Sequence, residues 1–172
     1  MIFVGGIHGV GKSSFTSILA NKLGFRVIIA SDIIKRFAST SLNKHVSNIE
    51  NNQKIIIDYF LNKDQRLGNI ILEGHFCLLS EDKKIVTISD NYFKSLSISK
   101  IIVMSASPVL IQKRLLKRDG IFWDLNLISE MQNFELKHAR YVSTALNIEL
   151  VELDEEQRCI EFFIGSLDNV ES

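Results

Sequence analysis

The glycine-rich segment GIHGVGKS, residues 6–13, constrains the fold of this chain more than any other feature. It matches the pattern G-x-x-x-x-G-K-[ST] at every fixed position. The apolar run MIFVGG precedes it at residues 1–6. A segment with helical periodicity follows, in which one face holds Phe15, Ile18, Leu19 and Leu23 before Gly24 supplies a stop signal. A strand, a tight loop and a helix in this order predict an α/β fold with a phosphate-binding loop.

The remainder of the chain continues the alternation of short apolar runs with helix-length segments. The runs are MIFVGG (1–6), RVIIA (26–30), NIILE (69–73), KIIVMS (100–105) and IELVEL (148–153). They are continuous rather than alternating, which is typical of strands buried on both faces of a parallel sheet. We therefore expect three layers, with a five-stranded parallel sheet between helices and with right-handed crossovers.

Three further helices are expected between these runs. One contains apolar residues at positions 46, 49, 56, 57 and 60 and is closed by Gly68. In SASPVLIQKRLL, Ser107 and Pro108 occupy an N-cap and a first helical position. The third spans residues 127 to 145, where apolar residues recur at 127, 131, 134, 141 and 145. His138 fills the remaining position of that stripe, so we expect it to be a core histidine.

Size and composition favour one soluble domain covering residues 1–172. The chain is 46% hydrophobic and 23% charged, with a formal net charge of zero, which argues against a nucleic-acid binder that uses a broad basic surface. No apolar run reaches the roughly 18 residues of a membrane helix, and no basic segment precedes the first run, so neither a membrane span nor a secretory leader is expected. Cys77 and Cys159 lie 82 positions apart and are expected to be free thiols, which predicts a cytoplasmic location.

The phosphate-binding loop has a direct physical basis. Gly6, Gly9 and Gly11 let the backbone approach an anion closely, and successive N–H groups form an anion nest beside the start of a helix. Lys12 is expected to reach the β- and γ-phosphates of a nucleotide, and the Ser13 hydroxyl to ligate Mg²⁺. The predicted ATP-binding set is Gly6, His8, Gly9, Val10, Gly11, Lys12, Ser13 and Ser14. His8 stands at a variable position, where it either faces solvent or touches a phosphate oxygen or the acceptor.

Two observations favour phosphoryl transfer over GTP hydrolysis or motor activity. Asn-Lys occurs in NKLG, NKHV and NKDQ, and none of them has the aspartate of the guanine-reading N-K-x-D element. In NIILEGH, Glu73 alone ends a buried strand, where a motor ATPase usually has Asp-Glu. Glu73 is well placed to hold the hydration shell of Mg²⁺. The alternative is a surface glutamate that faces a helix.

About 38 residues separate the second and third apolar runs, which is too many for one crossover helix. We expect a helical insert at about 32–67 that forms an acceptor-binding flap over the loop. Its candidate acceptor-binding residues are Asp32, Lys35, Arg36, Asn52 and Gln53. Gln53 interrupts an apolar stripe, as either a base-recognising amide or an ordinary boundary residue would.

A short lid is expected at about 114–127. Arg114 and Arg118 in KRLLKRDG (113–120) are four positions apart and share a helix face, with Lys113 and Lys117 on the neighbouring face. The alternative is a solvated basic face at a helix C-terminus. Because this helix follows the fourth strand, at the same sheet end as the loop, we expect both arginines to be catalytic. Analogous arginines raise phosphoryl-transfer rates by roughly 10³–10⁵.

Taken in order, GGIHGVGKSSF, ASDIIKR, ILEGHF, RLLKRD and QNFELKHARYVSTALNI resemble the P-loop nucleoside monophosphate kinases over nearly the whole chain. The chain is most similar to small adenylate-kinase-like proteins with a short lid, including the archaeal type. This resemblance implies a three-layer P-loop NTPase fold with strand order 2-3-1-4-5. It also implies ATP with Mg²⁺ as phosphoryl donor and a nucleotide-like acceptor.

The resemblance also assigns individual residues. Asp32 and Lys35 correspond to the acidic and basic pair that opens the acceptor flap, where arginine is more usual than lysine. Glu73-Gly74 matches an Asp-Gly that continues in the common type to Pro-Arg, whereas this chain reads EGHFCLL and lacks a phosphate-clamping arginine there. His75 has either an active-site role or a structural hydrogen bond beneath the loop. Adenine is expected near Leu153 and Asp154.

These features predict an ATP-dependent kinase, most simply a nucleoside monophosphate kinase, with ATP and a small-molecule acceptor as partners. Most of the catalysis would come from positioning and electrostatics. One alternative is an ATP-binding regulatory switch that recruits a protein partner, and the missing clamp supports it. Another is a kinase for a non-nucleotide small molecule. The neutral net charge makes nucleic-acid ends a weaker candidate acceptor.

Overall fold

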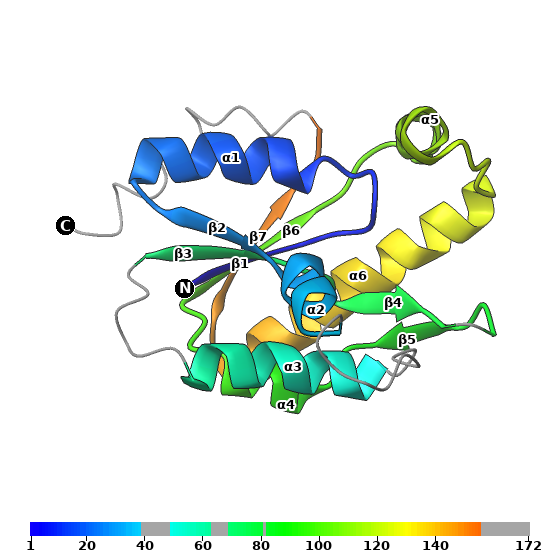
Figure 1. Ribbon diagram of the computed structural model, residues 1–172. Helices are drawn as coiled ribbons and strands as arrows, with labels where there is room; N and C mark the ends of the chain where they lie inside the picture. The colour runs from blue at the N-terminus through cyan, green and yellow to red at the C-terminus, as the bar shows by residue number, and fades with distance from the viewer. Residues whose placement is uncertain (39–48, 63–68, 81, 156–172) are drawn as a thin grey trace.

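A five-stranded parallel sheet forms the centre of the fold (Figure 1). The computed structural model describes residues 1–38, 49–62, 69–80 and 82–155. The strands lie in the order β2 (Arg26–Ile29), β3 (Ile70–Glu73), β1 (Ile2–Gly5), β6 (Lys100–Met104) and β7 (Glu149–Leu153), and every neighbouring pair is parallel. These are the five predicted strands, and counted among themselves in chain order they give the predicted order 2-3-1-4-5. The predicted fold class is therefore confirmed.

Helices cover both faces of the sheet, as the continuous apolar runs predicted. Ile2 and Val4 of β1 point to the face covered by α1 (Lys12–Leu23) and α5 (Pro108–Asp119). Phe3 points to the opposite face, beside Leu72 and Ile101, where α2 (Ala30–Ala38), α3 (Ile49–Asn62) and α4 (Asp90–Ser95) pack. In Figure 1, α1 lies on one side of the sheet and α3 and α4 lie on the other.

Local sequence signals set several helix ends. Gly24 ends α1 in the left-handed region, where its N–H donates to the carbonyl of Ala20. Pro108 opens α5 after Ser107, although the Ser107 side chain makes no capping hydrogen bond. Asp124 caps α6 (Leu125–Leu146) by accepting a hydrogen bond from the N–H of Leu127.

The buried face of α6 differs from the predicted stripe. Phe134 and Tyr141 are exposed, and His138 is half-buried and hydrogen-bonds through Nε2 to the carbonyl of Ile88 at 2.7 Å. The residues that α6 buries are Ile128, Met131, Gln132, Glu135, Ala139 and Val142. The buried face is thus rotated around the helix axis from the predicted one, and it contains a glutamine and a glutamate.

The sequence reading missed a two-stranded antiparallel sheet between β3 and β6. It consists of β4 (Cys77–Leu79) and β5 (Ile85–Thr87), with Leu78 opposite Val86. This hairpin packs on α6, where the Cys77 thiol donates to the carbonyl of Met131. It continues directly from the end of β3, and so it helps to fix the segment that carries Glu73.

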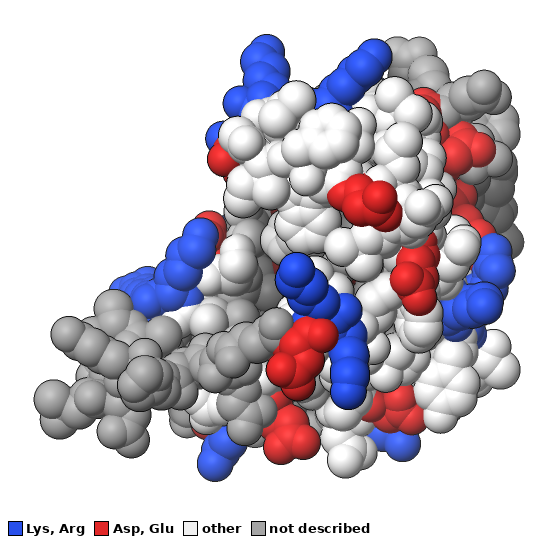
Figure 2. Space-filling view, turned by 90° about the vertical axis from the view of Figure 1, so that its right-hand side faces the viewer, with Lys and Arg blue, Asp and Glu red and all other residues white. Residues whose placement is uncertain are grey.

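The predicted helical insert of about 32–67 contains α2 and α3 within its described residues. Residues 39–48 and 63–68, the tail after residue 155 and therefore Cys159 lie outside the part of the chain that the structure describes. Within the described ranges, no helix has the length and apolar character needed to cross a membrane. On the face drawn in Figure 2, the basic and acidic side chains of the described residues are interspersed.

Candidate active site

The loop between β1 and α1 has the backbone geometry of an anion-binding turn. Gly9 has φ of 80°, in the left-handed region, and a Cβ at this position would lie 3.0 Å from Cγ of Leu115. Gly6 and Gly11 also have positive φ, and Val10 anchors the loop in the core. Helix α5 therefore presses on the outside of the loop and leaves room only for glycine at position 9.

Lys12 is the first residue of α1 and turns back over the loop. Its ammonium donates to the carbonyl of Gly6 and, at 3.2 Å, to the carbonyl of Ile7. Burial lowers the pKa of Lys12 from its usual value, and the charges of Glu135 and Glu73 oppose that shift. Lys12 is thus a desolvated cation held among backbone acceptors, and a phosphate at the loop would give it an anionic partner.

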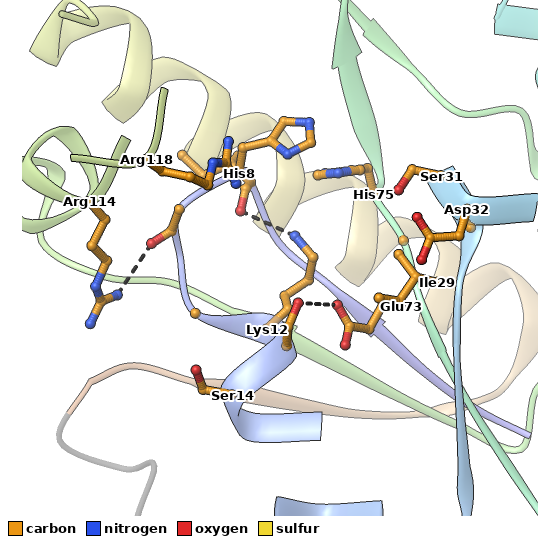
Figure 3. Close-up of a pocket in the computed structure, with 16 residues that line it drawn as sticks. His8, Lys12, Ser14, Ile29, Ser31, Asp32, Glu73, His75, Arg114 and Arg118 are labelled. Carbon is orange, nitrogen blue, oxygen red and sulfur yellow. Dashed lines mark hydrogen bonds between the residues drawn. The ribbon is translucent and has the colours of Figure 1, made fainter. Parts of the chain in front are cut away.

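Glu73 ends β3 beside the loop and is only 3% exposed. Its Oε2 accepts a hydrogen bond from the Ser13 hydroxyl at 2.9 Å (Figure 3). Its Oε1 accepts one from the Thr16 hydroxyl. The predicted metal pair, Ser13 and Glu73, is therefore brought together. The sequence reading missed Thr16, although its spacing of three from Ser13 places both hydroxyls on one helix face.

These oxygen groups fit magnesium. Mg²⁺ prefers hard oxygen ligands, keeps several waters and is often held by one or two protein groups together with substrate phosphates. One carboxylate and one hydroxyl at the phosphate-binding loop are such a set. Among the described residues there is no group of three histidine, cysteine or acidic side chains that could bind a metal without a nucleotide.

The two predicted catalytic arginines come from α5 and have different partners. Arg114 donates to the carbonyls of Gly9 and Val10 at 3.3 and 3.0 Å, so it contacts the loop itself. It also lies 3.6 Å from the Glu155 carboxylate. Arg118 makes two hydrogen bonds of 2.6 Å to Asp119. Both arginines line the cavity over the loop, but Arg118 would have to leave Asp119 to reach a phosphate with its full charge.

A cavity of about 350 Å³ lies over the loop and collects most of the predicted site. The predicted residues that line it are His8, Gly9, Gly11, Lys12, Ser13, Ser14, Asp32, Glu73, His75, Arg114 and Arg118. Figure 3 shows Arg114 and Arg118 on one side of Lys12, and Ser31 and Asp32 of α2 on the other. The size is within the usual range for small-molecule sites, about 300–1,000 Å³.

Four predicted acceptor residues do not line this cavity. Asn52 and Gln53 line a second cavity of about 180 Å³ that adjoins the first. Lys35 is exposed, 3.8 Å from Asp32, because it lies one helical turn further along α2. Arg36 lines a separate hollow with Asp58 and Tyr59. The structure therefore brings Asp32 and His75 to the phosphate site and does not bring Lys35 or Arg36 there.

Two histidines stand where the cavities meet. The rings of His8 and His75 are 4.4 Å apart between centroids. Burial lowers the pKa of His8 to about 3, and the charge of His75 adds to this effect. Burial also lowers the pKa of His75 well below 6.5, and nearby Lys12 lowers it further. Both rings are therefore uncharged at neutral pH, and His8 lines both cavities while its residue remains exposed to solvent.

Glu135 of α6 holds the turn at residues 75–77 in place by hydrogen bonds, and the sequence analysis did not identify it. It is 1% exposed, and its Oε2 accepts hydrogen bonds from the N–H groups of Phe76 and, at 3.0 Å, Cys77. Its Oε1 lies 3.2 Å from Nδ1 of His75, a hydrogen bond rather than an ion pair because His75 is neutral. Burial raises the pKa of Glu135, while the charge of Lys12 opposes the shift. Of the two alternatives for His75, the structural hydrogen bond is thus present.

The fold and the site together define a P-loop kinase-like protein. The chain belongs to the AAA domain family AAA_17, whose family model matches residues 5–121, more than half of the chain. No curated protein matches it.

Several solved structures share the fold. A shikimate kinase from Acinetobacter baumannii, in complex with shikimate, has a TM-score of 0.61 and 13% identity over 99% of this chain and 93% of that one. A deoxyadenosine kinase from M. mycoides with bound dATP has a TM-score of 0.57 and 14% identity over 99% of both chains. A gluconokinase from Sinorhizobium meliloti 1021 has a TM-score of 0.49 and 16% identity over 89% and 81%. At these identities the likeness to the shikimate kinase and the deoxyadenosine kinase shows the fold alone, and the match to the gluconokinase, at a TM-score below 0.5, supports no conclusion.

Proposed function

We propose that the protein is an ATP-dependent phosphotransferase that acts on a small, nucleotide-like acceptor. The observation that carries the proposal is the hydrogen-bonded group of Ser13, Thr16 and Glu73 beside a phosphate-binding loop with a partly buried lysine. In this proposal the loop amides and Lys12 bind the β- and γ-phosphates, and Ser13 and Glu73 hold Mg²⁺.

The roles of the arginines follow from their positions. Arg114 already contacts the loop carbonyls and fixes α5 against the nucleotide site. Arg118 would exchange Asp119 for the transferring phosphoryl group, where an added cation stabilises the charge of the transition state. Magnesium supplies charge neutralisation when it is bound, and the remaining catalysis comes from the positions of these side chains.

The acceptor belongs on the α2 side of the site. Asp32 and His75 face the phosphate cavity there, and Asn52 and Gln53 line the adjoining space. A nucleoside monophosphate is the acceptor that the resemblance to adenylate-kinase-like proteins implies. The two fold neighbours are named as a deoxyadenosine kinase and a shikimate kinase, and neither name denotes a phosphorylated acceptor. An unphosphorylated acceptor is therefore the alternative to a nucleoside monophosphate.

The test is ATP turnover with Lys12→Ala, measured as ADP release across a panel of acceptors. We expect the variant to lose at least about 100-fold of the activity, because the loop lysine neutralises the phosphates at which charge develops. Lys22→Ala is the matched control, since Lys22 lies exposed in the last turn of the same helix. Full transfer by Lys12→Ala would overturn the proposal. Slow ADP release that no acceptor changes would favour a regulatory switch.

A further inference from the structure

We propose that the acceptor is an uncharged, nucleoside-like molecule, and not a nucleoside monophosphate. Its ring would lie in the second cavity with an N–H or O–H donor against Asn52, and its hydroxyl group would reach the phosphate site. The inference rests on the proposed phosphotransferase function and names the acceptor class for that site.

The position of the second cavity fits an acceptor. It shares His8, Ala30, Ser31, Gly74 and His75 with the cavity over the phosphate-binding loop. The rest of its wall comes from α2, α3, the β4 end of the hairpin and the segment that leads into α4. The residues are Ile34, Ile49, Asn52, Gln53, Ile56, Leu78, Ile88 and Tyr92. A molecule bound there would have one end at the γ-phosphate position. The cavity volume of about 180 Å³ is many times the roughly 10–15 Å³ that one water molecule needs, so there is room for a ring system.

The described lining of this cavity contains no acidic side chain, lysine or arginine. Its described residues are apolar or carry amide, hydroxyl or imidazole groups. An anion placed inside would therefore find no counter-charge among these residues. Unpaired buried charges are strongly unfavourable, so the enclosed part of the acceptor is uncharged.

One polar atom of a lining residue has no hydrogen-bond partner, and this indicates the kind of ligand group that would bind. Oδ1 of Asn52 is buried and has no hydrogen-bond partner. By contrast, Oε1 of its neighbour Gln53 accepts a hydrogen bond from the Ser89 hydroxyl at 2.7 Å. Buried acceptors without partners are uncommon, and each one calls for an explanation. An amino, imino or hydroxyl donor on the ligand would satisfy Asn52, while the isoleucines and Leu78 would pack on the faces of a ring.

Charges at the junction favour a hydroxyl group over a second phosphate. The cations that line the phosphate cavity are Lys12, Arg114 and Arg118, and the two arginines lie on the far side of Lys12 from α2 (Figure 3). On the α2 side the charged lining residue is Asp32, whose carboxylate would repel an acceptor phosphate and can accept a hydrogen bond from a hydroxyl group. The side chain of Asp32 is 64% exposed, so water also reaches this side.

The reaction balances without a further reactant. The acceptor hydroxyl oxygen forms a bond to the γ-phosphorus of ATP, and the bond from that phosphorus to the β,γ-bridging oxygen breaks. The hydroxyl proton passes to water on the open α2 side. The products are a phosphate monoester of the acceptor and ADP.

The experiment compares each nucleoside with its own 5′-monophosphate. ADP release by the full-length protein with ATP and Mg²⁺ would be measured with adenosine or AMP, guanosine or GMP, cytidine or CMP, uridine or UMP, and their deoxy forms. We expect at least one nucleoside to stimulate turnover at least 10-fold more than its monophosphate. Formation of the monophosphate from that nucleoside would be followed directly by chromatography.

Asn52→Leu tests the contact itself. Loss of a hydrogen bond to a buried acceptor predicts a rise of about 10- to 100-fold in KM for the stimulating nucleoside. Asn51→Leu is the control, because Asn51 is exposed on the same helix and should leave that KM unchanged. Asn52→Ala replaces the leucine variant if the larger side chain prevents folding.

The outcomes separate this proposal from the proposed function. Preferential stimulation by monophosphates would overturn the uncharged acceptor and leave the phosphotransferase intact. A stimulating nucleoside whose KM is unchanged in both Asn52 variants would overturn the site. If no member of any pair stimulates turnover, the acceptor class is wrong, and turnover that still depends on Lys12 would show that the ATP site survives. Loss of that dependence as well would mean that the proposed function has failed.

Discussion

The hydroxyl of Thr16 offers a sharp test of how Glu73 is held. Thr16 is fully buried, and its hydroxyl donates to Oε1 of Glu73, while Ser13 serves Oε2. Thr16→Val keeps the branched shape and removes the donor. Glu73 would then keep one of these two hydrogen bonds at an exposure of 3%. The perturbation is therefore the loss of one charge-assisted hydrogen bond with little change in volume.

Hydrogen bonds to charged groups contribute about 1.5–3 kcal/mol, so Thr16→Val should lower the free energy of unfolding by about that amount. With an m-value of about 2 kcal/mol per molar urea, the midpoint should fall by about 1 M. The second effect is on the proposed metal site. Loss of a group that orients a metal ligand typically weakens metal affinity 10- to 100-fold, so the Mg²⁺ concentration for half-maximal ATP turnover should rise by a similar factor.

Thr16→Ser is the matched control, since it keeps the hydroxyl and loses only a methyl group. Urea denaturation and a Mg²⁺ titration of ATP turnover would be run on both variants and the wild type. The serine variant should resemble the wild type in its Mg²⁺ dependence. If valine and serine have the same urea midpoint and the same Mg²⁺ requirement, the hydrogen bond from Thr16 does not position Glu73, and the reasoning fails.

Three other changes follow from the described contacts. Glu135→Ala leaves the N–H groups of Phe76 and Cys77 without their acceptor, at about 1–3 kcal/mol each, so urea denaturation should show a loss of about 2–6 kcal/mol. Because burial raises the pKa of Glu135, the folded protein retains the proton of this carboxyl group at pH values where the unfolded chain has lost it. The free energy of unfolding therefore falls as pH rises from about 4.5 toward neutral. Glu135→Gln should reduce this pH dependence, measured by urea denaturation at a series of pH values. Gly74→Ala would place a Cβ 2.7 Å from Cζ of Phe3, and overpacking should lower the thermal midpoint by an amount corresponding to about 1–3 kcal/mol. An unchanged midpoint in the first or third variant, or an unchanged pH slope in the second, would contradict the corresponding contact.

The strands and the phosphate-binding loop were predictable because their signals are local. Each parallel strand is a continuous apolar run, and the loop carries its own spacing of glycine, lysine and serine. The β4–β5 hairpin was not predictable in the same way. Its strands have three residues each, and CLL follows β3 after only three residues, so it gives no separate periodic signal.

The α6 helix shows how a correct element can hide a buried residue of the site. Its predicted bounds were nearly right, but apolar residues at 134 and 141 drew the stripe onto an exposed face. Glu135 then looked like surface, although the helix buries it. A glutamate is buried here because two backbone N–H groups of the turn after β3 need an acceptor. These N–H groups lie far from Glu135 in the sequence and come close to it only in the folded protein, so no local sequence pattern predicts the contact.

The second cavity has a similar origin. Gln53 could be named from the sequence as an amide on an apolar stripe, with Asn52 as its neighbour. Their separation from Lys35 and Arg36 depends on how α2 and α3 pack. The distinction between a satisfied Gln53 and an unpartnered Asn52 depends on Ser89, which lies far along the chain. The sequence therefore identified both amides as candidates, but it could not predict which of them has a hydrogen-bond partner within the protein.

The buried thiol of Cys77 gives the protein an internal reporter. Cys77 directly follows the turn that joins Glu73 to the hairpin, it is inaccessible to solvent, and burial raises the pKa of its thiol. Since only the thiolate reacts quickly with disulfide reagents, modification requires this corner to open. In a Cys159→Ser background, the labelling rate of Cys77 would therefore measure the opening equilibrium of the catalytic corner under native conditions. Ligands that close the site should slow that rate in proportion to their occupancy, without an introduced cysteine.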